Sequence, residues 1–281
     1  MTNGIQIAHE APMSLMPLIR QVTDYDYALV HLFEDPEIGE AYKNFFQESM
    51  KMGRKVILDN SIFELGEAFD VGHFFYWVEK LLPTEYIIPD VFQDCRGTLT
   101  NVDKWFELVE SMNPELLNKC NAIAVVQGNT EKECIECYKA LSANPKIYKI
   151  AIPFDLPWYQ AENKITSKEI AFMEGRRIFI HKLNELNTSG TIKNPKPLHL
   201  LGCALPQEFE FYKEWYHRFS NIQSIDTSNP VLHGIEGIRY KPFGLELKSK
   251  TKMADVMKNS ISAEGFATVF FNVGTFRTFV K

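Results

Sequence analysis

The chain has 281 residues, of which 45% are hydrophobic and 23% are charged, and its formal net charge is −6 at pH 7. This length fits one large α/β domain, and the acidic balance argues against a broad basic surface for nucleic acid, although a local patch stays possible. Five cysteines without framework spacing indicate a reducing compartment. We find neither a secretory signal nor an apolar run long enough to span a bilayer, so we expect a cytoplasmic protein with no membrane partner.

Apolar runs alternate with amphipathic stretches along the chain. The short apolar runs predict strands, because most of them end at a turn signal or a polar residue, and the stretches between them predict helices. In chain order, the predicted strands are 27–33, 55–59, 86–91, 122–126, 148–152, 198–201 and 222–225, and the helices between them are 39–52, 72–82, 99–112, 130–142, 167–186 and 206–217.

Continuous apolar strands are typical of a parallel sheet that is covered on both faces. We therefore predict an α/β protein, a (β/α)8 TIM-type barrel that forms a single domain over residues 1–281. The eighth strand is expected at 267–271, after a helix near 253–260. The polar segment 231–252 contains three glycines and is expected to be a functional loop.

Polar residues follow the predicted strands at the edge where a parallel barrel gathers its functional side chains. These residues are Asp59, Asp90, Gln127, Pro153 with Asp155, Gly202 and Asp226. Carboxylates dominate the set and histidine is absent from it. Paired carboxylates suit either a hard metal ion or chemistry at a sugar C1 carbon. For any single aspartate, capping of the following helix explains its position equally well.

Taken in order, several segments resemble motifs of the tRNA-guanine transglycosylase superfamily. They are Leu58-Asp59-Asn60-Ser61-Ile62-Phe63-Glu64, Val126-Gln127-Gly128, Leu200-Leu201-Gly202-Cys203-Ala204-Leu205-Pro206-Gln207-Glu208, and the aspartates Asp90 and Asp226. The resemblance implies a (β/α)8 barrel that exchanges a base in a nucleic acid. It implies that Asp226 is the nucleophile and Asp59 the general acid/base. It also implies a group of substrate-binding residues, which are Asp90, Gln127, Gly128, Ile152 and Gly202.

Two departures from the family pattern refine this expectation. The tandem glycines of the first motif are replaced by Asn60-Ser61-Ile62, and no cysteine follows Cys203, so the family's zinc site is missing. Cys134 and Cys137 lie in a predicted helix and are interpreted as one helix face, not as metal ligands. We therefore expect no metal and no cofactor.

The zinc-less pattern looks more like the phage and bacterial branch that inserts a 7-deazaguanine base into DNA. DNA and a 7-deazaguanine are then the expected partners, and the residues expected to contact the nucleic acid are His233, Arg239, Tyr240 and Lys241. Three alternatives stay open: the same exchange on tRNA, a small-molecule nucleosidase or glycosidase, and a non-catalytic nucleotide-binding barrel. The identity of the 7-deazaguanine, the sequence context and the oligomeric state also stay open.

Overall fold

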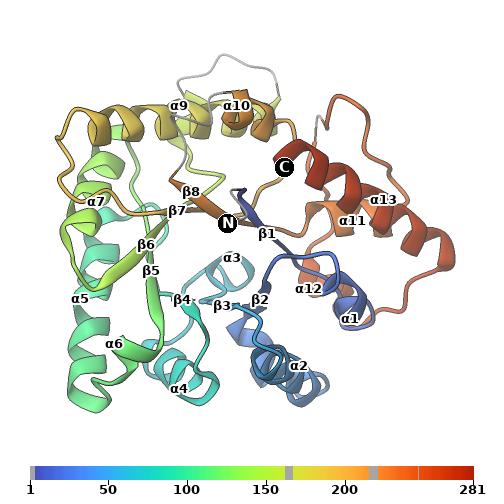
Figure 1. Ribbon diagram of the computed structural model, residues 1–281, viewed down its shortest axis with the longest axis horizontal. Helices are drawn as coiled ribbons and strands as arrows, with labels where there is room; N and C mark the ends of the chain where they lie inside the picture. Colours follow the sequence, from blue (N-terminus) through green and yellow to red (C-terminus); the bar gives the residue numbers. More distant parts are fainter. Residues whose placement is uncertain (1–3, 162–166, 215–220, 246) are drawn as a thin grey trace. The chain divides into compact units, whose positions relative to one another are not determined.

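Strands and helices alternate along the chain, and the strands form one eight-stranded sheet (Figure 1). The computed structural model describes residues 4–161, 167–214, 221–245 and 247–281. The strands are β1 (Gln6–His9), β2 (Asp26–Leu29), β3 (Val56–Asp59), β4 (Glu85–Ile87), β5 (Asn121–Val125), β6 (Ile147–Ile152), β7 (Leu198–Leu200) and β8 (Ile222–Thr227). Their order in the sheet is β1-β8-β7-β6-β5-β4-β3-β2, and each of the five strand pairs with a described register is parallel. The fold class is therefore the predicted (β/α)8 TIM type.

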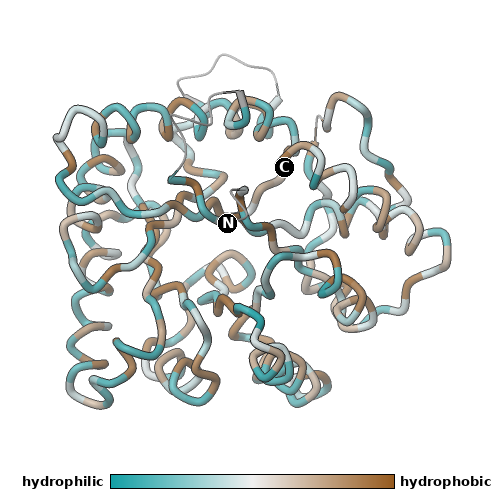
Figure 2. The backbone as a smooth tube through the Cα atoms, viewed as in Figure 1, coloured by the Kyte–Doolittle hydropathy of each residue, from teal (hydrophilic) through white to brown (hydrophobic). Residues whose placement is uncertain are grey.

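Several of the longer helices begin at conventional capping residues. Asp94 accepts a hydrogen bond from the Gly97 N–H group, and Thr130 accepts one from the Glu133 N–H group, as its sequence position predicted. The helices are η1 (Val30–Glu34, a 3-10 helix), α1 (Met16–Ile19), α2 (Gly39–Lys51), α3 (Ile62–Leu65), α4 (Val71–Leu81), α5 (Cys95–Met112), α6 (Leu116–Lys119), α7 (Glu131–Ala143), α8 (Trp158–Ala161), α9 (Lys168–Thr188), α10 (Glu208–Glu214), α11 (Asn229–Ile235), α12 (Met253–Val256) and α13 (Ala263–Val280). Hydrophobic and hydrophilic residues alternate along α5 (Figure 2), as expected of a helix with one buried face.

The contacts of the chain group it into two compact units, which we describe separately. Unit 1 comprises Met1–Asp24, Pro153–Leu186 and His199–Lys281, and unit 2 comprises Tyr25–Ile152 and Asn187–Leu198. The expectation of a single domain over residues 1–281 stays a prediction. None of the described helices is both long enough and apolar enough to cross a membrane.

Unit 2 contains the neighbouring strands β2 to β6 and is built around an aromatic core. Trp105 on α5 packs against Phe74 on α4 and Tyr86 on β4, with ring centroids 5.4 and 5.2 Å away. At the start of β4, the buried Glu85 carboxylate forms ion pairs with the ammonium groups of Lys55 and Lys149, each at 2.7 Å. These opposite charges satisfy each other, as buried charges must.

Unit 1 corrects the predicted eighth strand. Residues 267–271 lie within α13, and the eighth strand of the sheet is β1 near the start of the chain, which pairs with β8 through Gln6 and Ser224. A short apolar run fits a strand or a buried helix equally well. Ser262 favours the helix because it caps the N-terminus of α13: its side chain accepts a hydrogen bond from the Gly265 N–H group.

Helices α11 and α13 lie side by side in unit 1 (Figure 1). Gly234 on α11 faces Val269 on α13 so closely that a Cβ atom at position 234 would collide with the Val269 backbone. The absence of a side chain at Gly234 therefore permits this packing. Residues 231–235 of the expected loop belong to α11, so the loop begins later than the sequence predicted.

The first predicted strand is also shorter than expected. Strand β2 ends at Leu29, and the next five residues form the 3-10 helix η1. Val30, Leu32 and Phe33 in η1 are buried. The apolar run 27–33 thus predicted burial correctly, but burial alone does not determine the backbone conformation.

Candidate functional site

In unit 1, an aspartate and a histidine meet at neighbouring strands. Asp226 on β8 and His199 on β7 are joined by a 3.1 Å contact between Asp226 Oδ1 and His199 Nε2. The other ring nitrogen of His199, Nδ1, lies 3.0 Å from the Ser224 hydroxyl oxygen. The His199 side chain is fully buried, whereas 7% of the Asp226 side chain is exposed. Asp226 is therefore the member of this group that keeps some contact with solvent.

The loop after β7 adds a backbone donor to the same carboxylate. The Gly202 N–H group lies 3.1 Å from Asp226 Oδ2 and 3.3 Å from Oδ1. Gly202 has a φ of 61°, a left-handed conformation that glycine adopts without strain. The Cys203 N–H group donates to the Asp226 carbonyl oxygen at 3.0 Å. Both backbone and side chain of Asp226 are thus held by this loop.

A buried ion pair holds the loop in place. Arg176 on α9 donates to the Glu208 carboxylate through Nε at 2.8 Å and to the Leu201 carbonyl oxygen through Nη1 at 2.7 Å. Arg176 and Glu208 are both fully buried, and the Tyr212 hydroxyl donates to Glu208 at 2.8 Å. Burial raises the pKa of the nearby Cys203 thiol, so this cysteine stays neutral. Arg176 therefore fixes the loop that contacts Asp226.

The segment that follows β8 is tied to unit 1 by further hydrogen bonds. Asn229 donates to the Ala204 carbonyl oxygen and to the Tyr240 hydroxyl, and its side-chain oxygen accepts the Ser249 N–H group at 3.1 Å. His233 is buried in α11, where its ring lies near that of Tyr240 with centroids 5.9 Å apart. These bonds hold the segment against the rest of unit 1.

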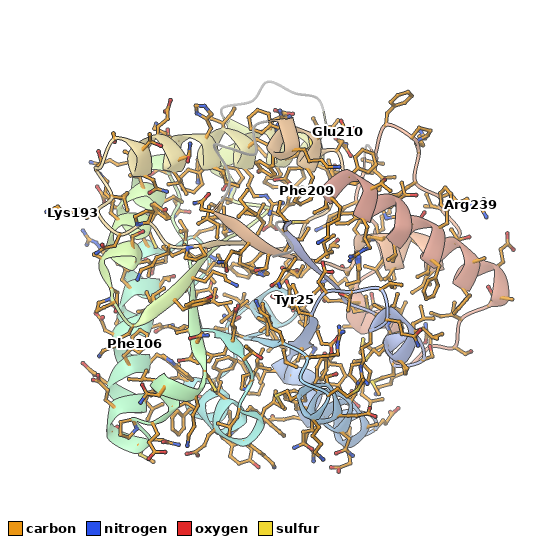
Figure 3. All side chains as sticks on the ribbon, viewed as in Figure 1. Tyr25, Phe106, Lys193, Phe209, Glu210 and Arg239 are labelled. Atoms are coloured by element: carbon orange, nitrogen blue, oxygen red, sulfur yellow. The ribbon has the colours of Figure 1, made fainter. Side chains whose placement is uncertain are left out.

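Two of the four residues predicted to contact nucleic acid are therefore interior residues, namely His233 and Tyr240. The other two, Arg239 and Lys241, are exposed. The Arg239 guanidinium lies over the Phe271 ring at 5.0 Å, and Figure 3 shows its side chain at the outside of the molecule.

In unit 2, a second group of polar residues lies on β2 and at the end of β3. The Tyr27 hydroxyl donates to Asp59 Oδ2 at 2.6 Å, and the Ser61 N–H group donates to Asp59 Oδ1 at 2.6 Å. Ser61 has a φ of 60°, a conformation that costs energy for a residue other than glycine. Asp59 is half-buried, so its carboxylate combines two short hydrogen bonds with access to solvent.

Two amides surround a buried carboxylate in the same unit. Asn60 donates to Asp90 Oδ1 at 2.8 Å, and Gln127 donates to Asp90 Oδ2 at 2.7 Å. The side-chain oxygen of Gln127 accepts the Gln93 N–H group at 3.0 Å, and Gln93 has a φ of 58°. Burial raises the pKa of Asp90 although both amides oppose that shift. Each Asp90 oxygen and both polar atoms of the Gln127 amide therefore already have partners inside unit 2.

The predicted site residues divide between the two units. Asp59, Asp90, Gln127, Gly128 and the buried Ile152 belong to unit 2, and Gly202 and Asp226 belong to unit 1. The structure brings Asp90 to Gln127 and Gly202 to Asp226, and the catalytic roles predicted for Asp226 and Asp59 stay predictions.

Three partner residues were missed by the sequence analysis, namely His199, Tyr27 and Asn60. Each lies in or directly after a predicted strand, but only His199 carried a usable signal, as a histidine inside an apolar run. Among the described residues, no group of three or more histidine, cysteine, aspartate or glutamate side chains is arranged to hold a metal ion.

Comparison with known proteins finds no matching family model and no matching curated protein. Solved structures with similar folds include the citrate lyase β subunit from Mycobacterium tuberculosis, which has 7% identity and a TM-score of 0.48 over 80% of this chain and 92% of that chain. The same subunit complexed with oxaloacetate and magnesium has 6% identity and a TM-score of 0.48 over 81% of this chain and 94% of that chain. The citrate synthase SbnG has 13% identity and a TM-score of 0.45 over 80% and 86% of the two chains.

These comparisons correct the predicted family. The similar structures are citrate lyase subunits and a citrate synthase, not tRNA-guanine transglycosylases. The resemblance to that superfamily was therefore wrong, and so were the predictions that depended on it: the glycosyltransferase class, base exchange, the 7-deazaguanine, and DNA or tRNA as partner. The short motifs misled because an aspartate or a Gln-Gly pair after a buried strand is also ordinary loop chemistry.

Proposed function

We propose that this protein is an enzyme that acts on a small molecule by proton transfer through Asp226, in a reaction of the lyase or aldolase type. The supporting observation is the contact between the nearly buried Asp226 carboxylate and the fully buried His199 imidazole. A general acid or base needs a fixed position and a defined partner, and Asp226 has both. Asp226 is the group that would touch the substrate, and His199 is a positioning residue.

Both ring nitrogens of His199 face polar groups on the neighbouring strand β8. His199 Nδ1 lies within hydrogen-bond distance of the Ser224 hydroxyl, whereas His199 Nε2 lies 3.1 Å from Asp226 Oδ1 without the geometry of a hydrogen bond. The Asp226 carboxylate also accepts the Gly202 N–H group at 3.1 Å. Such a carboxylate can remove a proton from a hydroxyl group while a carbon–carbon bond breaks. It can equally remove a proton from a carbon atom next to a carbonyl group.

A proton-exchange assay tests this proposal through the proton-transfer step alone, whatever bond is made or broken afterwards. The first compounds to try are small keto acids, because similar structures are described with pyruvate and with oxaloacetate, in each case together with magnesium. The protein would be incubated with each compound in heavy water, with and without magnesium, and loss of the C–H signal would be followed by NMR. We expect exchange faster than the background reaction.

Two variants then separate a catalytic role for Asp226 from a general effect on folding. Asp226→Asn is expected to slow the exchange by about 100-fold or more, the usual contribution of a general acid or base. Glu210→Gln removes an exposed carboxylate of the same unit and is expected to leave the rate unchanged. The proposal fails if folded Asp226→Asn exchanges at the rate of the unchanged protein, or if no tested compound exchanges above background.

A further inference from the structure

Helix α13 buries one face within unit 1 and exposes apolar residues on the other. Its buried residues pack against α11 and α10. On the other face, Phe266 is 38% exposed and Phe271 is 46% exposed, and the ring centroids of Phe266 and the half-buried Phe270 lie 4.7 Å apart. Ala267, which lies among these rings, is exposed as well. A contiguous apolar surface of this kind marks an interaction site more often than a single exposed side chain does.

The segment that follows α11 extends this surface. The Ile238 carbonyl oxygen and the Tyr240 N–H group both bond to the Asn272 side chain, so residues 238–240 run along α13. Between them, the Arg239 guanidinium lies over the Phe271 ring at 5.0 Å. We call the whole surface the α13 face, and its residues are Ile238, Arg239, Glu264, Phe266, Ala267, Phe270 and Phe271.

Two opposite charges lie on the same side of the α13 face. Glu264 is exposed in the first turn of α13, and Arg239 is held at the level of Phe271. Residues 264 and 271 are two turns apart, so they share one side of the helix and are separated by about 10 Å along its axis. Within the part of the chain that the structure describes, neither Glu264 nor Arg239 forms an ion pair.

We propose that the α13 face binds a second copy of this chain, with the two α13 helices antiparallel about a two-fold axis. Such an axis reverses the direction along the helix but keeps each residue on its own side of the contact. With the axis beside Ala267, Arg239 of one copy lies opposite Glu264 of the other, and Phe270 lies opposite Phe266. The small Ala267 side chain allows the two helices to approach closely where they cross.

The charge pattern favours a second copy over an unrelated partner. The α13 face carries both members of the ion pair itself, at the two positions that a two-fold axis brings together. Two pairs of opposite charges then form in each dimer, and charge complementarity of this kind fixes the register of an interface. A parallel pair of α13 helices would instead leave the unlike charges of the two copies about two turns apart along the helix axis.

Sedimentation of the whole protein over a range of concentrations tests the proposal. We expect monomer and dimer in an equilibrium that depends on concentration. Ala267→Arg places a long charged side chain at the two-fold axis and is expected to leave only monomer. Glu107→Arg is the matched control, because it introduces the same side chain at an exposed position of α5 in unit 2, and it should leave self-association unchanged.

A charge-exchange experiment tests the antiparallel arrangement itself. Glu264→Arg and Arg239→Glu each create two like-charge contacts in the dimer, so each variant alone is expected to associate about tenfold more weakly or worse. In an equimolar mixture, a dimer with one copy of each variant regains opposite charges at both places. The mixture should therefore dimerise more strongly than either variant alone, which a folding defect could not explain.

Three results would overturn the proposal, each obtained on protein whose circular dichroism shows a native fold. The first is a monomer at every concentration, which would assign the α13 face to a different partner. The second is a dimer that Ala267→Arg leaves intact, because that dimer would form through another surface. The third is a mixture of the two charge variants that dimerises no better than its components, because Glu264 and Arg239 would then not face each other.

Discussion

Replacing His9 with glutamine is expected to make the protein less sensitive to acid. His9 is the last residue of β1, is 6% exposed, and packs edge-on against Phe276 of α13 with ring centroids 5.7 Å apart. Burial, with a smaller contribution from the positive charge of Arg277, lowers the pKa of His9 to about 3, and Asp24 opposes this shift only in part. The folded protein therefore holds His9 neutral at every pH where it is normally handled.

The size of the effect follows from proton binding in the two states. An unfolded histidine has a pKa of about 6.5, so between that value and the folded pKa of about 3 the unfolded chain binds a proton at His9 that the folded protein does not. The contribution is fully present above pH 6.5 and is lost progressively as the pH falls toward 3. Lowering the pH from about 7.5 to about 5.5 thus costs about 1.4 kcal/mol of unfolding free energy through His9 alone.

Other ionisable groups also make the free energy of unfolding depend on pH, and their contributions must be separated from that of His9. Burial lowers the pKa of His31 and of His233, so both act in the same direction. Asp24 has a lowered pKa, because hydrogen bonds from Arg277 and other donors outweigh its burial, and it contributes below about pH 4. A comparison of variants at the two pH values isolates His9, since the other groups remain.

Urea unfolding at the two pH values provides the measurement. His9→Gln is expected to be less stable at both pH values, because an amide replaces a well-packed ring, but its loss between them should be smaller by about 1.4 kcal/mol. His181→Gln changes a surface histidine whose side chain is 39% exposed. This variant should lose as much unfolding free energy between the two pH values as the unchanged protein does. An equal loss in His9→Gln and in the unchanged protein would refute the reasoning, because His9 would then titrate alike in both states.

Two further predictions concern stability within unit 1. Arg176→Met leaves the Glu208 carboxylate buried without its ion pair and is expected to cost about 3–5 kcal/mol by urea unfolding, part of which the double variant with Glu208→Gln should recover; a cost below about 1 kcal/mol would show that water reaches Glu208. Gly234→Ala should cost about 1–3 kcal/mol, because its methyl group would meet the Val269 backbone. Gly274→Ala on α13, where a Cβ atom meets no other atom within 4 Å, should instead stabilise the protein, and equal effects of the two alanines would contradict the close helix contact.

The fold was largely predictable because most strands are continuous apolar runs with a break at each end. Strand β1 escaped prediction because only four residues, Gln6–His9, pair with β8. The run at 267–271 was assigned to the wrong type of element, because a short apolar run does not reveal the helical period: Val269 is buried in α13, whereas Phe271 is 46% exposed.

The site was predictable only in part. The aspartates at strand ends could be identified from the sequence. Their partners come from other strands, and the sequence does not show which strands are neighbours in the sheet. His199 and Asp226 meet because β7 and β8 are neighbours, and Asn60 meets Asp90 because β3 and β4 are neighbours. The family resemblance failed for a related reason, since its short motifs follow buried strands and coincide with common loop chemistry.

The division of the chain between the two units has a consequence for folding during synthesis. Unit 2 is nearly contiguous, since Tyr25–Ile152 supplies five neighbouring strands, so a growing chain can begin to assemble it early. Strand β1 is made first, yet its partner β8 is made near the other end of the chain. Until then, the backbone groups of β1 that later pair with Ser224 and its neighbours have no strand to bind. A ribosome-bound chain should therefore protect unit 2 from proteolysis well before it protects its own first residues.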